Sequence, residues 1–492
     1  MRSALRSALM VLPAIPALLA AGCAGGDDDT VPIAIVGSPT APFDSGARLS
    51  QAGKLVRGAT FEGLTGFDEE GRVVPALADR WIITDDGLSY IFRLRDGTWI
   101  DGSPLTAVSA RGALRKALAD IKGTPLASDV LAISEVRAMA GRVIELRLAY
   151  RHPDLLQLLA QPELGLNNKG VGAGPMSLVR EGNLAVLTPL SPGRRGLPKE
   201  DGWRERARTL QVAALRMEQA VEDLRAGRTS LVMGGSAADF PLASRVGIAH
   251  GVVRIDPVAG LFGFAVLHAD GFLADTANRE AIAMAIDRDE LGRALDVPGW
   301  APSTRIVSAG MEGDLGTIGE RWSQLDLDER RATASARVTR WRNSGNPVPV
   351  LRIAMPGGPG ADALFVQLQE DLQFIGVDAR RVGESADAEL RLVDTVARYP
   401  RASWFLGQLA CPLRRGLCSQ EADRLAIEAR RATDGASRAA LLAEAESELT
   451  TANVFIPLGP PVRWSAMRRN VTGFSVNRWG VHPLMPLAML PK

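Results

Sequence analysis

The most informative stretch of the sequence is residues 73–118, VVPALADRWIITDDGLSYIFRLRDGTWIDGSPLTAVSARGALRKAL. An apolar run at 81–84, a turn at Asp85-Asp86-Gly87 and an alternating run at 89–95 predict a β-hairpin. In that hairpin the side chains expected to face the core are Tyr90, Phe92 and Leu94, and those expected on the opposite face are Arg93 and Arg95. Apolar residues spaced four apart then predict a helix over 107–119, so the segment indicates a mixed α/β chain.

A second stretch, residues 351–382, predicts a strand, a helix and a second strand, which form a βαβ unit with a right-handed crossover. Its glycine-rich run PGGPG (356–360) lacks the Lys-Ser/Thr pair of a P-loop, so we interpret it as a flexible connection and not as a phosphate site. Residues 274–295 and 437–453 predict further helices.

Composition limits the class of protein. The 492 residues carry 57 Lys+Arg and 56 Asp+Glu, a net charge of +1, and 46% of them are hydrophobic. This balance is typical of a folded soluble protein of two to four domains, and it excludes a disordered chain and a polytopic membrane protein. The near-neutral charge also argues against a nucleic-acid partner.

The first thirty residues have the pattern of an export signal. Arg2 and Arg6 precede an apolar run at 8–21, which is too short to span a bilayer. Small residues and then Cys23 follow, and this resembles the lipobox of bacterial lipoproteins. We expect a signal peptide at 1–22, lipidation of Cys23 and a tether at 23–30, which would place the protein in the periplasm or cell envelope. The alternative is an ordinary signal peptide followed by an unmodified cysteine.

Cys411 and Cys418 lie seven positions apart in ACPLRRGLC. Export makes a disulfide between them the expected state, and so short a loop would stabilise the fold by roughly 2–2.5 kcal/mol. Two free thiols are the alternative. We expect no metal site here, because neither a histidine nor a second cysteine pair is nearby.

Motifs of common enzymes are missing. The four histidines, 152, 250, 268 and 482, have no metal-ligand spacing, and neither HExxH nor GxSxG occurs. The glycines of KGVGAGP (169–175) do not form the GxGxxG pattern of a dinucleotide site. We therefore expect a protein that is not an enzyme and that carries no cofactor.

The 73–118 segment looks like the signature region of the family 5 extracellular solute-binding proteins, the oligopeptide- and dipeptide-type receptors of ABC importers. The matching residues, in order, are Pro75, Leu77, Ala78, Trp81, Asp86, Gly87, Tyr90, Phe92, Leu94, Arg95, Gly97, Asp101, Gly102, Pro104 and Thr106. Stretches that are similar to later family segments follow in the expected order at 172–179, 272–291, 366–377 and 454–474.

The resemblance implies the type II periplasmic-binding-protein fold, with two α/β lobes joined by hinge strands near Pro257 and Pro461 and an extra α/β domain on the first lobe. The ranges that it implies are lobe I at 31–50, 165–256 and 465–492, the extra domain at 51–164, and lobe II at 257–464. A ligand that contacts both lobes would hold them closed.

The resemblance also implies a ligand site. Peptide-binding members place an Asp shortly after a Trp, and that Asp pairs with the α-amine of the peptide. Here ASWFLGQLACP (402–412) retains Trp404, followed by Phe405, but has Gly407 and Gln408 where the Asp is expected. A buried ammonium without a counter-charge is unfavourable, so we expect Trp404, Phe405 and Gln408 to contact a neutral polar group of the ligand. Ordinary packing and a solvated loop residue are the alternative.

The function implied is capture of a peptide-like or small polar ligand and its delivery to an ABC permease and ATPase. A transporter-independent sensor or a peptide-binding chaperone is the alternative. A lipoprotein hydrolase is a third hypothesis, although the sequence offers no catalytic Ser and His pair for it.

Overall fold

The computed structural model describes residues 29–491, and its strands form three sheets and a small hairpin. The seven-stranded sheet, on which lobe I is built, has the order β12-β18-β11-β1-β10-β9-β8. Its strands are β1 (Thr30–Val36), β8 (Met176–Glu181), β9 (Leu184–Pro189), β10 (Thr209–Leu215), β11 (Leu231–Ser236), β12 (Val252–Ile255) and β18 (Arg463–Met467). The helices of this lobe are α5 (Trp203–Arg206), α6 (Met217–Ala226) and α14 (Leu484–Leu487). Helix α1 (Gln51–Thr60), at the start of the range expected for the extra domain, packs against the lobe I strands β1 and β8.

The extra domain holds a four-stranded sheet of order β4-β5-β7-β6, beside the small hairpin β2 (Thr65–Phe67) and β3 (Val73–Pro75). Its other elements are β4 (Ala78–Ile83), β5 (Ser89–Leu94), β6 (Ile133–Ala138), β7 (Val143–Leu148), α2 (Ala107–Asp120), α3 (Pro125–Asp129) and α4 (Leu155–Leu159). The predicted hairpin is confirmed, because β4 and β5 pair antiparallel with Trp81 opposite Phe92.

The burial of this hairpin follows the predicted alternation up to its last residue. Tyr90, Phe92 and Leu94 are buried and Arg93 is exposed. Arg95 was expected on the exposed face, and that expectation is wrong. The strand ends at Leu94, and the Arg95 guanidinium turns inward to donate to the carbonyls of Ala76 and Ala173.

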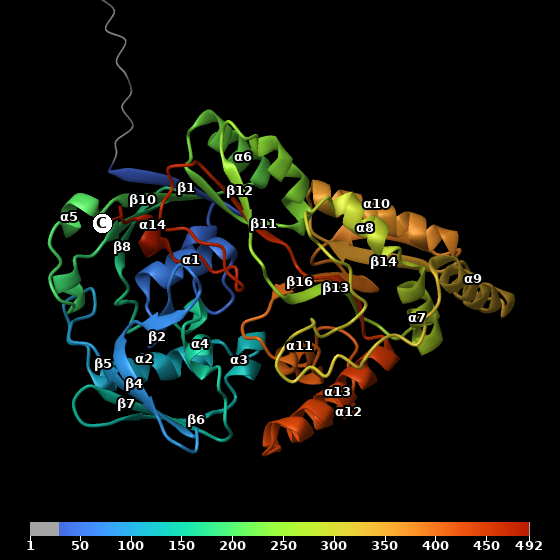
Figure 1. Ribbon diagram of the computed structural model, residues 1–492, viewed down its shortest axis with the longest axis horizontal. Helices are drawn as coiled ribbons and strands as arrows, with labels where there is room; N and C mark the ends of the chain where they lie inside the picture. Colours follow the sequence, from blue (N-terminus) through green and yellow to red (C-terminus); the bar gives the residue numbers. More distant parts are fainter. Residues whose placement is uncertain (1–28, 492) are drawn as a thin grey trace, which may run out of the picture.

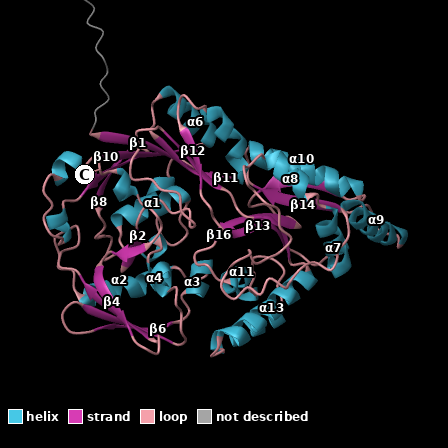
Figure 2. Ribbon diagram, viewed as in Figure 1, coloured by secondary structure: helices cyan, strands magenta, loops and turns pink. Residues whose placement is uncertain are grey.

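Lobe II is built on the five-stranded sheet β15-β14-β16-β13-β17. Its strands are β13 (Gly260–Val266), β14 (Val350–Met355), β15 (Asp378–Gly383), β16 (Leu390–Val396) and β17 (Phe455–Gly459). Helices lie on both sides of this sheet (Figure 2), namely α7 (Thr276–Ala285), α8 (Arg288–Leu295), α9 (Leu327–Asn343), α10 (Pro359–Phe374), α11 (Ala402–Gln408), α12 (Gln420–Arg431) and α13 (Gly435–Ala452).

The predicted βαβ unit is confirmed, because β14 and β15 run parallel on either side of α10 in the sequence. The reading of PGGPG as a flexible connection is wrong. Pro359 already begins α10, and a Cβ placed on Gly360 would lie 2.1 Å from the carbonyl oxygen of Ala237. The glycines therefore allow a close contact between lobe II and the 3-10 helix Ala237–Val246 that follows β11.

The single helix predicted over 274–295 is also wrong, because the structure divides it into α7 and α8 at Ile286 and Asp287. The Asp287 side chain caps α8, and its backbone N–H donates to Asp371 on α10 at 3.0 Å. Arg288 is buried and donates to the carbonyl of Pro457 at 2.8 Å. These tertiary contacts break a pattern that is helical by periodicity alone.

The chain crosses between the lobes twice, at 256–259 between β12 and β13 and at 460–462 between β17 and β18. The crossings lie side by side, because Ile255 pairs with Trp464 and the Asp256 N–H donates to the carbonyl of Arg463 at 2.9 Å. The buried Asp256 carboxylate also contacts His482 at 3.0 Å. The predicted α/β architecture, two lobes with crossing strands and an extra domain, is confirmed (Figure 1).

Candidate functional site

Lobe II also contacts the extra domain, away from the crossing segments and from the contact of α10 with the 3-10 helix Ala237–Val246. Residues 397–401, which follow β16, lie against the extra domain, and α11 lies against α3 (Figure 1). We call the contact between 397–401 and residues 125–163 the interlobe junction. Apolar packing continues across it, since a single cluster of buried side chains includes Leu158 of α4 and Trp404 of α11.

Asp129, at the end of α3, is the central polar residue of the junction. Its carboxylate accepts a hydrogen bond from Arg398 Nη1 at 2.9 Å and another from the Tyr399 hydroxyl at 3.2 Å. Burial raises the pKa of Asp129 to about 6, although Arg398 and Tyr399 oppose the shift. Burial also raises the pKa of Tyr399 well above its usual value. The closed lobes thus hold a carboxylate that titrates near neutral pH.

A second ion pair joins Asp154 of the extra domain to Arg401 of lobe II. Arg401 also pairs with Glu312, which belongs to its own lobe. The Gln157 side-chain amide donates to the carbonyl of Arg398. The ring of His152 meets that of Tyr399 edge-on, with centroids 5.4 Å apart. All the cross-junction contacts among these residues are non-covalent, so they can form and break as the lobes move.

The extra domain adds charged groups beside the junction. Lys54 of α1 pairs with Glu163 at 3.0 Å. Burial would raise the pKa of Glu163, but Lys54 and Arg398 outweigh it and hold that pKa below its ordinary value. Burial lowers the pKa of Arg57, whose guanidinium lies over the ring of Phe61.

The predicted ligand contacts lie on α11. Trp404 and Phe405 are 0% exposed and Gln408 is 2% exposed. The two rings pack edge-on with centroids 5.0 Å apart, and the Gln408 side-chain carbonyl accepts from Arg415 Nη1 at 3.2 Å. In this closed conformation the three side chains belong to the core. Their burial lends no support to direct ligand contact, which stays a prediction.

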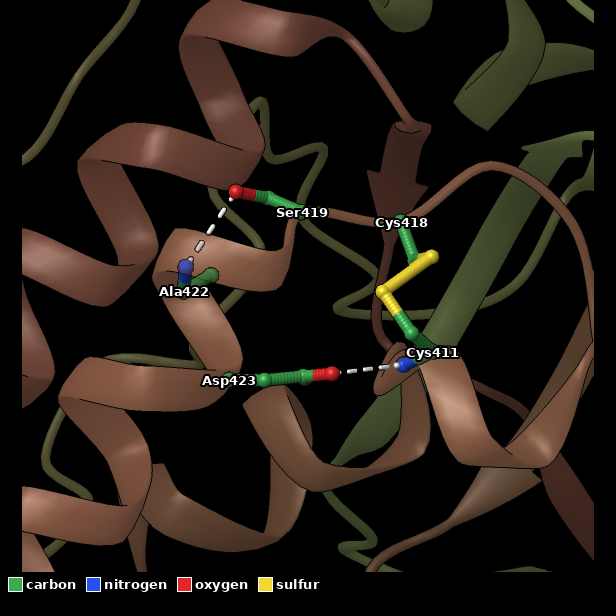
Figure 3. Close-up of a disulfide and its surroundings, with 5 residues drawn as sticks. All are labelled: Cys411, Cys418, Ser419, Ala422 and Asp423. Atoms are coloured by element: carbon green, nitrogen blue, oxygen red, sulfur yellow. Dashed lines mark hydrogen bonds between the residues drawn. A yellow bond between two sulfur atoms is a disulfide. The ribbon is translucent and has the colours of Figure 1, made fainter.

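A disulfide joins Cys411 and Cys418 just after α11 (Figure 3). Asp423 of α12 accepts from the Cys411 N–H at 3.1 Å, and the Ser419 hydroxyl accepts from the Ala422 N–H at 3.2 Å, capping the same helix. The loop that carries Arg415 is therefore fastened at both ends to α11 and α12. Cys23, the signal peptide and nearly all of the tether lie outside the described residues.

A cavity of about 270 Å³ lies on one side of the junction only. It is lined by α1, the β2–β3 hairpin and residues 481–486, all within lobe I and the extra domain. A neighbouring cavity of about 310 Å³ is lined by residues 95–102 and 173–195. Neither cavity lies between the lobes.

The structure gives two negative findings for the part of the chain it describes. Over residues 29–491, no group of three or more His, Cys, Asp or Glu side chains is placed to hold a metal ion. Nor does any helix within that range have the length and apolar character needed to cross a bilayer.

Sequence reasoning missed the junction residues themselves. Asp129, Asp154, Arg398 and Arg401 belong to no motif, and the structure alone pairs positions about 250 residues apart. One signal was available. RYPR (398–401) lies just beyond the end of β16 (Leu390–Val396), and charged residues at the carboxyl end of a strand often serve a site.

Comparison with known proteins gives a consistent result. Residues 72–180 match the family profile described as bacterial extracellular solute-binding proteins, family 5 Middle. The probable deoxycholate-binding periplasmic protein YgiS of Escherichia coli K12 is 36% identical over 123 residues, 21% of this chain and 23% of that protein. The glutathione-binding protein GsiB of the same strain is 24% identical over 205 residues, 42% of this chain and 38% of that protein. The chain thus aligns with less than half the length of these relatives.

Solved structures agree over almost the whole chain. OppA of Burkholderia pseudomallei superposes with a TM-score of 0.78 at 20% identity, covering 95% of this chain and 100% of that one. OppA of Haemophilus influenzae, solved in complex with the peptide RPPGFSPFR, gives 0.80 at 16% identity, covering 95% and 99%. At such low identity these likenesses establish the fold.

Proposed function

We propose that this chain, which belongs to the family 5 bacterial extracellular solute-binding proteins, captures a peptide-like or other small polar ligand between its two lobes. Its lobes have the type II periplasmic-binding-protein fold. The observation that carries the proposal is the interlobe junction. Its ion pairs link the lobes reversibly, while the two adjacent crossing segments supply a hinge.

The ligand would be small and organic. The matched relatives are named for deoxycholate and glutathione, and two structural neighbours were solved with the peptides RPPGFSPFR and STSA. We infer that the ligand of this chain falls in the same size range. We also propose that the protein acts by binding and release, without covalent chemistry.

We assign lobe I to 31–50, 165–256 and 465–492, the extra domain to 51–164, and lobe II to 257–464. The strands support this division, because no strand is split between two parts except at Thr30 of β1 and the first two residues of β18. Each lobe then rotates as a unit about the crossings, and ligand contacts on both sides favour closure.

Delivery is the second part of the proposal. A lipid on Cys23 would hold the protein at the membrane, where a permease and its ATPase receive the ligand. Substitution of Cys23 by Ser should release the protein into the soluble periplasmic fraction and abolish labelling by an alkyne-tagged fatty acid. Membrane retention of the Cys23→Ser protein would contradict the anchor.

Two measurements test capture and delivery together. Native mass spectrometry of the purified protein should show a bound small molecule that denaturation releases. Cells that lack the gene should then lose uptake of that molecule, and complementation should restore it. Normal uptake in the deletion strain would instead indicate a sensor or a chaperone, and a ligand-free protein under all growth conditions would contradict capture.

A further inference from the structure

The cavity of about 310 Å³ lies apart from the interlobe junction, where residues 95–102 of the extra domain meet residues 173–195 of lobe I. The charged side chains that line it are all arginines, namely Arg95, Arg194 and Arg195, and the other lining residues are uncharged. We call it the arginine cavity. Its lining thus has the charge that attracts an anion.

The arginines of this cavity outnumber the carboxylates that pair with them. Over residues 29–491, Glu62 is the one carboxylate within ion-pair distance of any of them, and it contacts Arg95 Nη2 at 3.0 Å and Arg195 Nη2 at 2.9 Å. The exposed fractions of the three side chains are 3% for Arg95, 18% for Arg195 and 12% for Glu62. Two guanidinium groups and one carboxylate leave an excess positive charge in a poorly solvated place, which is unfavourable without a counter-ion.

Two other carboxylates on the same loop are already engaged and do not line the cavity. Asp96 is 81% exposed and pairs with Arg142. Asp101 accepts hydrogen bonds from the backbone N–H and the hydroxyl of Ser103, at 2.9 and 2.7 Å. Neither carboxylate therefore supplies the missing negative charge.

Two of the lining arginines have donors that no protein group accepts. The Nε of Arg195 is buried and has no hydrogen-bond partner among the described residues. The side chain of Arg194 is exposed and makes no ion pair or hydrogen bond in that part of the chain. Arg95, by contrast, donates to the carbonyls of Ala76 and Ala173. Arg194 and Arg195 are thus the residues with donors left for a ligand.

Close backbone packing holds the walls of the cavity in place. The Arg95 guanidinium donates to the carbonyl of Arg195. Gly196 has a φ of 71°, and a Cβ on it would overlap the carbonyl oxygen of Asp96. Trp99 is 1% exposed, and its Nε1 donates to the Ser109 hydroxyl at 3.2 Å. The two loops therefore form the cavity without help from a ligand.

We propose that the arginine cavity binds the phosphate group of a small phosphomonoester through the side chains of Arg194 and Arg195. Three arginines against one carboxylate leave two excess positive charges, and a phosphomonoester carries about −1.5 to −2 near neutral pH. It balances this excess better than the single charge of a carboxylate. Guanidinium donors also match phosphate oxygens in two-point geometry.

The volume sets the size of the ligand. An engineered cavity of about 150 Å³ holds benzene, so the arginine cavity has room for about twelve non-hydrogen atoms. That is more than a phosphate group alone and leaves space for a short organic body beside Trp99 and Leu190. The site lies outside the interlobe junction, so this inference goes beyond the proposed function and does not depend on it.

Four probes test the inference by calorimetry on the purified protein: glycerol 3-phosphate, inorganic phosphate, lactate and glycerol. Glycerol 3-phosphate should bind with sub-millimolar affinity, at least about tenfold more tightly than lactate, and glycerol should not bind. Its affinity should weaken below about pH 6, where the phosphate loses its second charge. Equal affinity for lactate, or no binding of either phosphate, would overturn the inference.

Variants locate the site. Arg194→Gln and Arg195→Gln should each weaken binding of glycerol 3-phosphate by about tenfold. Arg195→Gln leaves Arg95 and Glu62 as a balanced pair, and Arg194→Gln removes a side chain without a partner, so that variant carries the test even if the other fails to fold. Arg93→Gln is the matched control, because Arg93 is an exposed arginine of the extra domain that has no ion pair over residues 29–491. Parent-like affinity in Arg194→Gln, or an equal loss in Arg93→Gln, would contradict the assignment.

Two sources supply a phosphomonoester, a free molecule and a lipid headgroup. Cosedimentation of the Cys23→Ser protein with phosphatidylcholine vesicles that contain phosphatidic acid separates them. Vesicle binding that Arg194→Gln abolishes assigns the headgroup, and binding of glycerol 3-phosphate without vesicle binding assigns a free molecule. The small molecule that co-purifies with the protein should not compete with glycerol 3-phosphate. Competition would place the phosphate between the lobes and overturn the inference, whereas failure of the phosphate site leaves capture between the lobes intact.

Discussion

At the scale of single residues, Asp129 combines a junction contact with an unusual titration. Its pKa of about 6 in the folded protein lies above its ordinary value of 3.8, so the folded state binds the proton more tightly. For a carboxyl with a raised pKa, stability is greatest at low pH and falls as the pH rises from about 4 to about 6.

The variant Asp129→Asn should remove this part of the pH dependence. A pKa shift of two units corresponds to about 3 kcal/mol. Between pH 4 and pH 7 the parent should therefore lose up to about 3 kcal/mol of unfolding free energy that Asp129→Asn does not lose. Urea titrations at several pH values measure it. The control variant Asp85→Asn lies in an exposed turn and should leave the pH dependence of stability unchanged. If the stability of Asp129→Asn varied with pH in the same way as that of the parent, the raised pKa of Asp129 would be contradicted.

Residue-level prediction from sequence succeeded where the cause was local. The alternation of Tyr90, Phe92 and Leu94 specifies which face is buried, because neighbouring strand residues point to opposite sides. The pattern did not reveal that Arg95 turns inward, since its partners Ala76 and Ala173 are distant in sequence. The ligand contacts at Trp404, Phe405 and Gln408 came from the resemblance to the family; their side chains are buried, and their contact with a ligand stays a prediction.

At the scale of elements, the KGVGAGP glycines illustrate how a sequence pattern serves packing. Gly174 donates its N–H to the Thr60 carbonyl at 3.0 Å, and a Cβ on Gly174 would lie 2.5 Å from the Thr60 carbonyl carbon. The segment before β8 can therefore lie directly on the end of α1.

Gly174→Ala should lower the unfolding free energy by about 1–3 kcal/mol, because the added methyl overlaps backbone that cannot retreat. Thermal or urea unfolding measures the loss. Gly112→Ala is the matched control, since a Cβ at this position in α2 meets nothing within 4 Å. Alanine has a higher helix propensity than glycine, so Gly112→Ala should be neutral or stabilising by up to about 1 kcal/mol. An equal loss of stability in the two variants would contradict the close packing of Gly174 on α1.

The disulfide loop gives a second prediction at this scale. Replacing Cys411 and Cys418 together by Ser should reduce stability by about 2.5 kcal/mol, the loop-closure entropy of so short a ring. The parent protein in reducing agent should behave like the variant, and an unchanged melting temperature in both would contradict the role of the bond.

Helices and strands could be predicted where the periodicity that specifies them lies within one continuous segment of the sequence. The β4–β5 hairpin and the β14–α10–β15 unit follow from local periodicity. The break between α7 and α8 was not predictable in that way, because it depends on Asp371 and on the Pro457 carbonyl. The same limit applies to PGGPG, whose close partner is the helix after β11 on the other lobe.

At the scale of the whole molecule, the interlobe junction and the two crossing segments both connect lobe II to the rest of the chain. Arg401 offers a direct way to test the junction, because it has one partner across the lobes, Asp154, and one within its own lobe, Glu312. Asp154→Asn should shift the ligand-free protein toward the open state and weaken ligand binding by about three- to tenfold. Glu312→Gln should do neither. Small-angle scattering compares their radii of gyration, and an equal expansion in the two variants would contradict a specific role of the cross-lobe pair.

The distance between the lobes, measured with and without ligand, shows whether ligand binding closes them. Spin labels at Leu131→Cys in the extra domain and Ile427→Cys in α12, both exposed, report on the junction by pulsed electron resonance in a Cys23→Ser background. We predict a longer or broader distance distribution in the ligand-free protein, and a single shorter distance when the co-purified small molecule is added to saturation. One unchanged distance in all these states would contradict an account based on two lobes that close around a ligand.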